Sequence, residues 1–330
     1  MKKLLMLTTG GTISSVDSAQ GLVPSSGNKL LNQIGDEHNE FNINVEEIML
    51  LDSSNIQPEE WNIIATSIYN HINDYDGIIV THGTDTLAYT TSMVSFMIQN
   101  PKIPIVFTGS QLPINHFQTD AVSNLRSAIA MAMSETPGIY VAFDRQIILG
   151  TRAVKVRTTS FHAFESINVK SAGFVNSNGL NLNKSVIPTY TGETTFNNNI
   201  NSNVFLLKLT PATNPSIIDM LINSNVQGIV IEAFGIGGLQ FIRRDFVSKL
   251  MLAADKNIPV VICSQCLYEP SNLNVYQVGR KALGAGVIEA YDMTTEACVT
   301  KLMWALGQTN KTEEIKTIFD KNIAGEISTK

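Results

Sequence analysis

The feature that most constrains the fold is a β-branched run that ends abruptly in a polar turn, at residues 78–86 (IIVTHGTDT). The next residues, 87–99, place Met93, Phe96 and Met97 on one apolar side, and this spacing predicts a helix. The turn therefore lies where the carboxyl end of a buried strand meets a helix N-terminus. Ligands of open α/β sheets bind at such strand ends, and the free N–H groups of the helix favour an anion. A helix cap needs only one Ser, Thr or Asp, so this run of polar side chains predicts a functional site.

The same alternation of strand and helix recurs through the first half of the chain and predicts a mostly parallel sheet. Strands are expected at residues 4–7, 48–51, 78–80, 103–107, 138–143 and 147–149, and helices at residues 58–72, 87–99 and 120–133. Four of these strands run into turns that carry hydroxyl groups, at Thr12, Ser53, Thr84 and Ser110. The carboxyl ends of parallel strands lie along one edge of a sheet, so we expect these hydroxyl groups to face one crevice.

The composition changes at residues 188–203 (PTYTGETTFNNNINSN), which have little to bury and a strong preference for turns. Beyond this segment the alternation resumes, with strands expected at residues 204–209, 228–231 and 259–262 and helices at residues 216–222, 243–254, 295–306 and 312–319. The predicted fold class is therefore α/β in two domains. Residues 1–187 form a larger domain with a mostly parallel sheet and flanking helices, residues 188–203 a linker, and residues 204–330 a smaller α/β domain.

Composition and charge argue against a nucleic-acid-binding or membrane protein. The chain of 330 residues is 44% apolar and 16% charged, as globular proteins are, and its net charge of −6 comes without any cluster of Lys and Arg. The apolar run that opens the sequence is too short for a secretion signal, and no run approaches the roughly 18 residues of a membrane span. We therefore expect a cytoplasmic protein with neither nucleic-acid nor membrane partners.

The sequence contains no metal or cofactor motif. Its 5 histidines form no HxH or HExxH pattern, and Cys263 and Cys266 have CxxC spacing without a second pair of ligands. The 3 cysteines are too few for a disulfide framework and suit a reducing cytoplasm. A dinucleotide enzyme is a weak alternative, because Gly10 and Gly11 lack the third glycine of that fingerprint. We expect neither a metal nor a cofactor.

The chemistry that remains is that of hydroxyl groups, one carboxylate and a nearby cation. The chain lacks GxSxG, GxxxxGK[ST] and any Cys/His pair at a recognisable spacing. A hydroxyl group becomes a competent nucleophile only beside a base or a cation. Asp85 supplies a carboxylate in the polar turn, and Arg152 and Lys155 are the candidate cations. A Thr–Lys–Asp arrangement would activate a hydroxyl, although by pattern alone Lys155 also fits a solvated surface charge.

Two hexapeptides give the chain a resemblance to a known family. Residues 8–13 (TTGGTI) together with residues 81–86 (THGTDT) resemble the paired signature of the bacterial-type L-asparaginase family. Residues 52–55 (DSSN), 108–111 (TGSQ) and 150–155 (GTRAVK) follow in that family's order, and the match extends through residues 291–297 (YDMTTEA). The GSQ motif and the absence of a signal peptide resemble the cytoplasmic, type I branch.

This resemblance implies an amidohydrolase that converts L-asparagine and water to L-aspartate and ammonia. Thr12 is implied as the nucleophile, which forms a β-aspartyl ester and releases ammonia before water hydrolyses the ester. Thr84, Asp85 and Lys155 are implied as the supporting catalytic residues, with the backbone N–H of Thr84 stabilising the oxyanion. The group that removes the proton from Thr12 stays open, as does the preference between asparagine and glutamine.

The resemblance also implies how a zwitterionic amino acid binds. Asp85 would hold the α-ammonium group, and Ser53 would bind the α-carboxylate in the turn that also carries Asp52 and Ser54. The backbone of Ser110 lies where the leaving amide should be. A homo-oligomer is implied as well, a dimer of dimers with the site near a subunit interface.

One position departs from the family, and two other readings stay open. Many members carry a tyrosine on the loop after the first motif, where this chain has Leu22, although residues 12–27 are still typical of a lid. His82 is interpreted as a structural partner of its turn. The alternatives are the amidase subunit of a tRNA-dependent amidotransferase and a non-catalytic protein that binds or senses amino acids.

Overall fold

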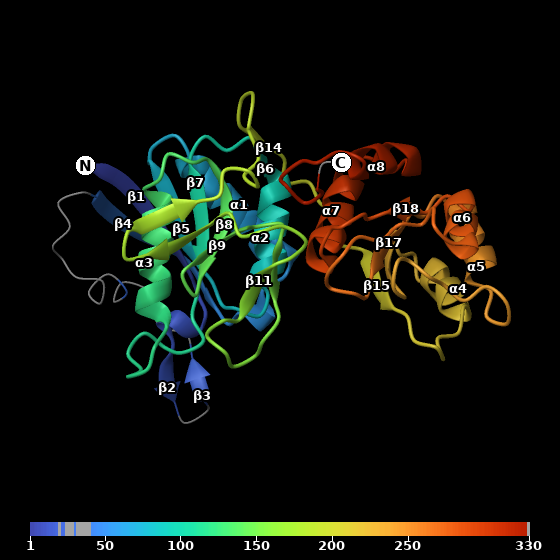
Figure 1. Ribbon diagram of the computed structural model, residues 1–330, viewed down its shortest axis with the longest axis horizontal. Helices are drawn as coiled ribbons and strands as arrows, with labels where there is room; N and C mark the ends of the chain where they lie inside the picture. Colours follow the sequence, from blue (N-terminus) through green and yellow to red (C-terminus); the bar gives the residue numbers. More distant parts are fainter. Residues whose placement is uncertain (19–20, 24–29, 31–40, 329–330) are drawn as a thin grey trace. The chain divides into compact units, whose positions relative to one another are not determined.

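Parallel sheets organise both parts of the chain. The structure, a computed structural model, describes residues 1–18, 21–23, 30 and 41–328. The chain divides into two units, Met1–Asn198 and Asn199–Lys330 (Figure 1). No helix in the described part of the chain combines the length and apolar character needed to cross a membrane.

The first unit is built on an eight-stranded sheet with the order β13-β12-β9-β8-β7-β5-β1-β4. Strands β4, β1, β5, β7 and β8 pair in parallel, whereas β9, β12 and β13 are added antiparallel. The strands are β1 (Lys2–Gly10), β4 (Phe41–Leu51), β5 (Gly77–Thr81), β7 (Pro104–Thr108), β8 (Gly138–Phe143), β9 (Gln146–Leu149), β12 (Gly173–Asn176) and β13 (Gly179–Leu182). Among the residues described in the first unit, three short pairs lie outside this sheet: β2 (Val16–Ser18) with β3 (Gly21–Val23), β10 (Ala153–Lys155) with β11 (Phe164–Ser166), and β6 (Ile98–Gln99) with β14 (Thr195–Phe196).

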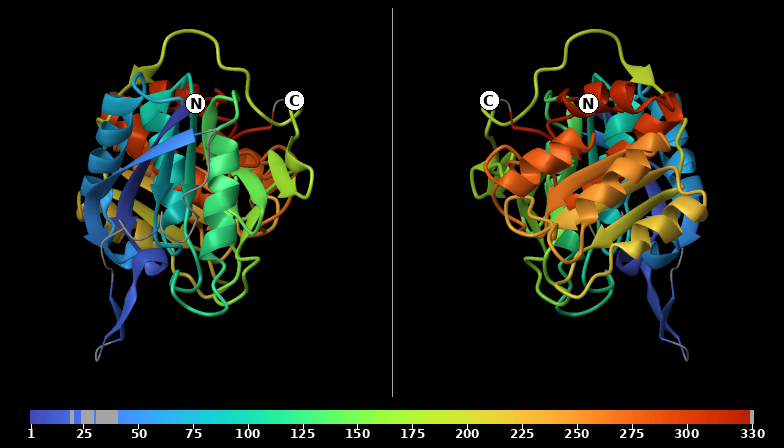
Figure 2. Two further views of the ribbon diagram at one scale, coloured as in Figure 1. Left: turned by 90° about the vertical axis from the view of Figure 1, so that its left-hand side faces the viewer. Right: turned by 90° about the vertical axis from the view of Figure 1, so that its right-hand side faces the viewer.

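Helices cover both faces of this sheet, which is why its central strands are continuous apolar runs. Helices α1 (Pro58–His71) and α2 (Leu87–Met97) lie on one face and α3 (Ala121–Ala132) on the other (Figure 2). Leu4, Met6, Ile79 and Val106 share a buried core with Leu125 of α3. Every residue of β5 and β7 is buried.

The register of the sheet brings the polar turns to one level. Thr8 of β1 pairs with Thr81 of β5, and Thr81 pairs in turn with Thr108 of β7. Gly10, at the end of β1, pairs with Leu51 at the end of β4. The turns that follow these four strands therefore start side by side along one edge of the sheet, as the sequence predicts.

The second unit has a four-stranded parallel sheet of its own, in the order β15-β16-β17-β18. Its elements are β15 (Val204–Lys208), α4 (Ser216–Asn223), β16 (Gly228–Ala233), α5 (Phe246–Asp255), β17 (Val260–Ser264), α6 (Gln277–Gly284), β18 (Ile288–Glu289), α7 (Thr295–Gln308) and α8 (Thr312–Phe319). One core packs against α4, α5 and α6 and a second against α7 and α8. The expected fold class, an α/β protein with a larger mostly parallel sheet and a smaller α/β part, is confirmed.

A buried ion pair holds the end of the described chain in the second unit. Lys301 of α7 and Glu326 are both fully buried, and Lys301 Nζ lies 2.6 Å from Glu326 Oε1. Lys301 also donates to the carbonyl oxygen of Lys321 at 2.7 Å, and Glu326 accepts from the backbone N–H groups of Ile323 and Ala324. Each charge thus has several partners, as buried charges require.

Several segments differ from the sequence-based expectation. The helix expected at residues 87–99 ends at Met97, because Ile98–Gln99 leave it to pair with Thr195–Phe196 as β6 and β14. That pairing also puts a strand inside residues 188–203, the segment expected to be a linker. Strand β4 begins at Phe41 rather than near residue 48.

Candidate active site

Glycines bring the polar turns into contact. Gly11 has φ of 77°, and a Cβ there would lie 2.5 Å from the backbone N of Gly83. A Cβ on Gly83 would lie 2.5 Å from Ser53 Oγ, and one on Gly109 would lie 2.3 Å from the carbonyl oxygen of His82. Side chains at these positions would force the turns apart, so the absence of a Cβ lets the turns after β1, β4, β5 and β7 pack together.

Thr12 begins the short 3-10 helix Thr12–Ser14, directly after Gly11. Gly11 donates to the carbonyl oxygen of Leu51 at 2.9 Å, and Ser15 Oγ donates back to the carbonyl oxygen of Gly11 at 2.9 Å. Ile13 beside it is fully buried in the core, whereas Thr12 is half-buried. The hydroxyl-bearing residue is thus held on a fixed turn, and Gly11 packs this turn against the one that carries Thr84.

Lys155 contacts two residues of the turn after β5, Thr84 and Asp85. Its Nζ lies 2.8 Å from Thr84 Oγ1 and 2.6 Å from Asp85 Oδ1. The Lys155 side chain is 18% exposed and Asp85 is 61% exposed, so the ammonium is largely shielded while the carboxylate can reach a ligand from solvent. The sequence pattern alone also fits Lys155 as a solvated surface charge. The geometry instead gives a Thr–Lys–Asp cluster.

The turn after β4 contacts the same cluster from the side. Asp52 caps the short helix Ser53–Asn55, and its Oδ1 accepts from Ser54 N at 2.8 Å and from Ser54 Oγ at 2.5 Å. Ser53 is buried, and its Oγ accepts from the backbone N–H of Asp85 at 3.2 Å. Thr86 Oγ1 donates to the carbonyl oxygen of Ser53 at 2.7 Å. Ser53 therefore ties the two turns together, whereas Asp52 and Ser54 shape the turn.

The turn after β7 is built on a buried network that the sequence pattern does not reveal. Ser110 is buried, and its Oγ donates to the carbonyl oxygen of Leu112 at 2.5 Å. The Asp120 carboxylate accepts from the backbone N–H of Gln111 at 3.0 Å and from Asn124 Nδ2 at 3.0 Å. In the sequence, Gln111 stands out only as the last residue of the GSQ motif. Its place immediately after Ser110, at a predicted strand end, is the signal that could have singled it out.

His82 is buried and fully bonded. Its Nδ1 lies 2.7 Å from the carbonyl oxygen of Gly83, which can only accept, so Nδ1 carries the proton. Nε2 then accepts from Thr90 Oγ1 at 3.0 Å, and Thr90 Oγ1 accepts from Trp61 Nε1 at 3.1 Å. Burial lowers the pKa of His82 to about 4, against the opposing effect of the Gly83 hydrogen bond. His82 is therefore a neutral structural residue of the turn.

The expected lid at residues 12–27 and the substitution at Leu22 fall largely outside what the structure describes. Backbone is described at Leu22, within β3, but its side chain is not. Residues 19–20 and 24–27 of that segment lie outside the described residues.

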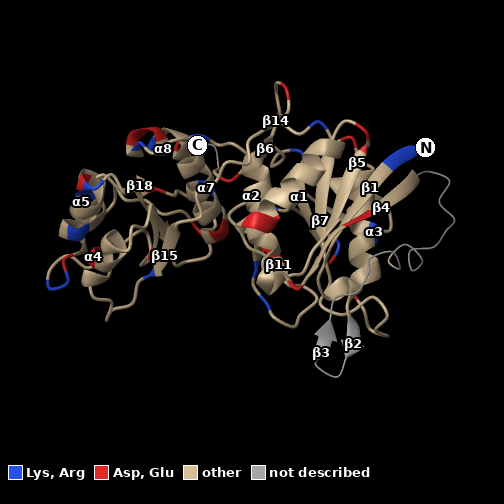
Figure 3. Ribbon diagram, turned by 180° about the vertical axis from the view of Figure 1, so that it is seen from behind, with Lys and Arg blue, Asp and Glu red and all other residues tan. Residues whose placement is uncertain are grey.

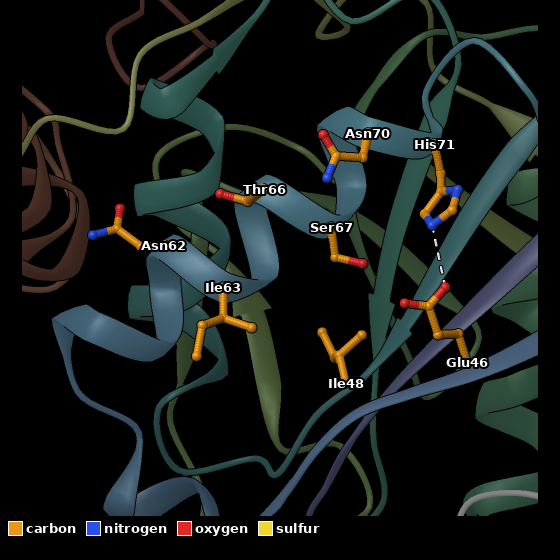
Figure 4. A pocket seen from close by; sticks show the side chains of 8 residues that line it. All are labelled: Glu46, Ile48, Asn62, Ile63, Thr66, Ser67, Asn70 and His71. Carbon is orange, nitrogen blue, oxygen red and sulfur yellow. Dashed lines mark ion pairs between the residues drawn. The ribbon is translucent and has the colours of Figure 1, made fainter.

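A cavity of about 530 Å³ lies elsewhere in the first unit, between β4 and α1 (Figure 4). It is lined by Glu46, Ile48, Asn62, Ile63, Thr66, Ser67, Asn70 and His71. Ser67 and His71 sit one helical turn apart, but His71 Nε2 is paired with Glu46 Oε2 at 3.1 Å. Ser67 Oγ has no hydrogen-bond partner within the described part of the chain. A nucleophile must contact its base, so this groove does not form a hydroxyl–histidine pair.

Within the described ranges, the placement of charges and cysteines indicates no second site. On the side seen in Figure 3, basic and acidic residues are interspersed along the ribbon. Of the CxxC pair, Cys263 is buried at the end of β17 and Cys266 is exposed, and both are free. No group of three or more His, Cys, Asp or Glu among the residues described could hold a metal ion.

Comparison with known proteins gives matches along almost the whole chain. Residues 3–188 match the family described as “Asparaginase, N-terminal” and residues 203–319 the “Glutaminase/Asparaginase C-terminal domain”. An L-asparaginase of Thermococcus kodakarensis is 44% identical over 99% of both chains. The solved structure of the thermostable L-asparaginase from that organism superposes with a TM-score of 0.95 at 43% identity, over 99% of this chain and 100% of that one. One of the subunits of the Glutamyl-tRNA(Gln) amidotransferase from Methanosphaera stadtmanae is 37% identical over 99% of this chain and 77% of its own length.

Proposed function

The chain belongs to the asparaginase family, and from this premise we propose that it hydrolyses L-asparagine to L-aspartate and ammonia through a covalent threonyl ester. An amidohydrolase is what the sequence predicts, and the family matches confirm that class of enzyme. The observation that carries the finer proposal is the contact of one shielded ammonium, Lys155, with both Thr84 Oγ1 and Asp85 Oδ1. Such a cluster is suited to activating a hydroxyl group.

The first half-reaction forms the ester. The Thr12 oxygen attacks the side-chain amide carbon of asparagine and gives up its proton, which the Asp85 carboxylate can accept, whereas the Lys155 ammonium only donates. The amide oxygen becomes an oxyanion, which the backbone N–H of Thr84 stabilises, a kind of contact worth roughly 10²–10³ in rate. The carbon–nitrogen bond then breaks, and the nitrogen leaves as ammonia after it takes up a proton. The acyl group stays on Thr12.

The second half-reaction returns the free enzyme. A water molecule attacks the ester carbon and gives up its proton, the bond to the Thr12 oxygen breaks, and that oxygen regains a proton. Aspartate then leaves. Splitting one difficult amide hydrolysis into two acyl transfers is the general advantage of covalent catalysis.

The substrate's charged groups are held by the turns around Thr12. Asp85 takes the α-ammonium group, since its carboxylate is 61% exposed. Ser53, in the turn shaped by Asp52 and Ser54, takes the α-carboxylate, and the backbone of Ser110 faces the leaving amide. An acid, an anion-binding turn and a hydroxyl between them are what a zwitterionic amino-acid amide requires.

The test is ammonia release from L-asparagine and L-glutamine at matched concentrations. Thr12→Ala should abolish release while the melting temperature stays unchanged, and Thr12→Ser, which keeps a hydroxyl, should retain part of it. Release by Thr12→Ala near the wild-type rate would overturn the nucleophile assignment. Mass spectrometry of the stopped reaction should detect the acyl group on wild-type protein and not on Thr12→Ala.

Lys155→Met should lower kcat by roughly 10²-fold or more while KM changes little, because the ammonium acts on a developing charge. Arg157→Met is the matched control. Arg157 lies on the same hairpin, but its guanidinium pairs with Glu165 at 2.7 Å. A loss confined to KM in Lys155→Met would make Lys155 a binding residue instead.

A second candidate is the amidase subunit of a tRNA-dependent amidotransferase, favoured by the 37% identity to the Methanosphaera protein. Such a subunit would pass ammonia to a glutamyl-tRNA bound by a partner. Free ammonia release at full rate by the isolated chain, unchanged by tRNA and a partner protein, speaks for the hydrolase.

We also propose a cytoplasmic homo-oligomer, a dimer of dimers. Light scattering that gives only the mass of one chain would refute the assembly. Cell fractionation with antibody detection would test the location.

A further inference from the structure

Gln111 is anchored from two sides at the edge of the candidate active site. It follows Ser110 in the turn after β7, and its backbone N–H donates to both oxygens of Asp120, at 3.1 and 3.0 Å. Asp120 is buried, and Asn124, fully buried, bonds to it and to the carbonyl oxygen of Gly109 at 3.0 Å each. The backbone from which the Gln111 side chain extends is therefore fixed.

The orientation of the Gln111 amide follows from its partners. Nε2 donates to the carbonyl oxygens of Thr158 and Ser160, at 3.0 and 3.1 Å. An amide nitrogen has two protons, and both are used on carbonyl oxygens that can only accept. The amide therefore cannot be flipped without setting three oxygens against one another, and Oε1 faces Thr84 Oγ1, 3.4 Å away.

The direction of the bonds at Thr84 follows in the same way. An ammonium group only donates, so Lys155 Nζ donates to Thr84 Oγ1. The hydroxyl's own proton then points to Gln111 Oε1, the acceptor on its other side. That distance is longer than the usual O–H···O bond, and active-site bonds of this kind shorten when substrate binds.

Gln111 also holds the hairpin from which Lys155 extends. Lys155 ends β10, and residues 156–163 lead to β11, with Val156 N donating to the carbonyl oxygen of Ala163 at 2.8 Å. Thr158 and Ser160, which accept from Gln111, lie at the tip of this hairpin. One amide thus joins the turn after β7 to Thr84 and to the tip of the hairpin from which Lys155 extends.

We propose that Gln111 is a positioning residue, which directs the Thr84 hydroxyl and holds the Lys155 hairpin in register with it. The inference rests on the proposed function, since it deepens the role of the same cluster. Gln111 acts through Thr84 and Lys155 rather than on substrate. Its loss should therefore slow the chemical step and leave substrate affinity nearly unchanged.

Steady-state ammonia release tests this role with a matched pair of variants. Gln111→Met keeps the length of the side chain and removes all three hydrogen bonds. Gln146→Met is the control, because Gln146 also approaches the hairpin, with Nε2 3.4 Å from His162 Nδ1, but its Oε1 accepts from Ser171 and not from Thr84. We expect Gln111→Met to lower kcat roughly 10- to 100-fold with KM within about twofold, and Gln146→Met to change kcat less than about threefold.

Hydrogen–deuterium exchange of the peptide spanning residues 153–166 provides a readout that needs no substrate. Exchange at Val156 and Arg157 should speed up at least about fivefold in Gln111→Met, because the hairpin tip loses two of its bonds. Gln111→Glu should behave similarly, since its second carboxylate oxygen would face the two carbonyl groups.

Wild-type kcat together with wild-type exchange in Gln111→Met would overturn the inference. Equal losses of kcat in Gln111→Met and Gln146→Met would overturn it too, because general loosening of the hairpin would then explain both. A wild-type protein that releases no ammonia would instead refute the proposed function. The exchange measurement would still decide whether Gln111 holds the hairpin.

Discussion

The neutral state of His82 should make the first unit lose stability in mild acid. In the buried ring, Nδ1–H donates to the carbonyl oxygen of Gly83 and Nε2 accepts from the Thr90 hydroxyl. A second proton would have to bind to Nε2, where the Thr90 hydroxyl already donates. Burial lowers the pKa of His82 from 6.5 to about 4. Between these two pH values His82 is protonated in the unfolded chain, where its pKa is near 6.5, and neutral in the folded chain.

The sign and size of the effect follow from these two values. Above pH 6.5 both states are neutral and His82 costs nothing. As the pH falls from 6.5 to 4 the unfolded state is favoured increasingly, by about 1.4 kcal/mol for each unit of separation between the two pKa values. The separation of about 2.5 units therefore gives a full loss of roughly 3 kcal/mol, of which about 2 kcal/mol is reached by pH 5.

Urea unfolding at pH 8 and pH 5 measures this loss, with the emission of Trp61 as the probe in a Trp304→Phe background. Trp61 is a suitable reporter, since it donates to the Thr90 hydroxyl that contacts His82. His82→Gln cannot titrate, so carboxylate effects cancel when the two proteins are compared. The free energy of unfolding of wild type should fall by about 2 kcal/mol more than that of His82→Gln. An equal fall in both proteins, or an NMR pKa near 6.5 for His82, would refute the reasoning.

Two further predictions concern packing and a buried charge pair. Gly83→Ala would put a Cβ 2.5 Å from Ser53 Oγ, and we expect it to cost about 1–3 kcal/mol of stability in urea unfolding and to reduce ammonia release. Gly284→Ala lies in α6 and meets nothing within 4 Å, so it should be neutral or stabilising by up to about 1 kcal/mol. Glu326→Gln should destabilise the second unit by about 3 kcal/mol or more, because it removes the negative charge that lies 2.6 Å from the buried Lys301 ammonium. The double change of both residues to Met should recover most of that loss. Thermal melts followed by circular dichroism check the second case, and a single variant as stable as wild type would contradict it.

Elements whose signal is local were predictable from the sequence. The helix expected at residues 312–319 is α8 without change. The one expected at 58–72 is one residue longer than α1 at its end, and the one expected at 120–133 is one residue longer than α3 at each end. The spacing of their apolar residues predicts which side of each helix is buried. The same holds for β5 and β7, whose continuous apolar runs require cover on both faces.

Elements that depend on distant partners were not predictable. Residues 98–99 continue the apolar pattern of α2, and only pairing with residues 195–196 turns them into a strand. Helix α6 carries glycines at 279 and 284, which weaken any local helix signal, and was not expected. Gly279 is required there because a Cβ would lie 2.2 Å from the carbonyl oxygen of Leu273. Such close contacts between segments leave no periodic trace in the sequence.

The candidate site divides along the same line. The turns at Thr12, Ser53, Thr84 and Ser110 could be predicted because each follows a recognisable strand. The contact of Lys155 with Thr84 could not, since 71 positions separate the two residues. From the sequence, only the resemblance to a family groups Lys155 with Thr84. The roles of Asp120 and Asn124 could not be predicted, because an Asp at a helix N-cap and an Asn within a helix are common in any sequence.

The close fit of the glycines also limits how this site can be redesigned. Gly11, Gly83 and Gly109 set the spacing between neighbouring turns by direct contact with the adjacent turn, so a mutagenesis library that randomises them would consist mostly of inactive clones. Useful diversity for altered substrate preference lies instead in side chains around the Thr84–Lys155–Asp85 cluster that do not fill a turn. A library aimed at a glutamine-selective or asparagine-selective variant should keep the three glycines fixed and vary other positions.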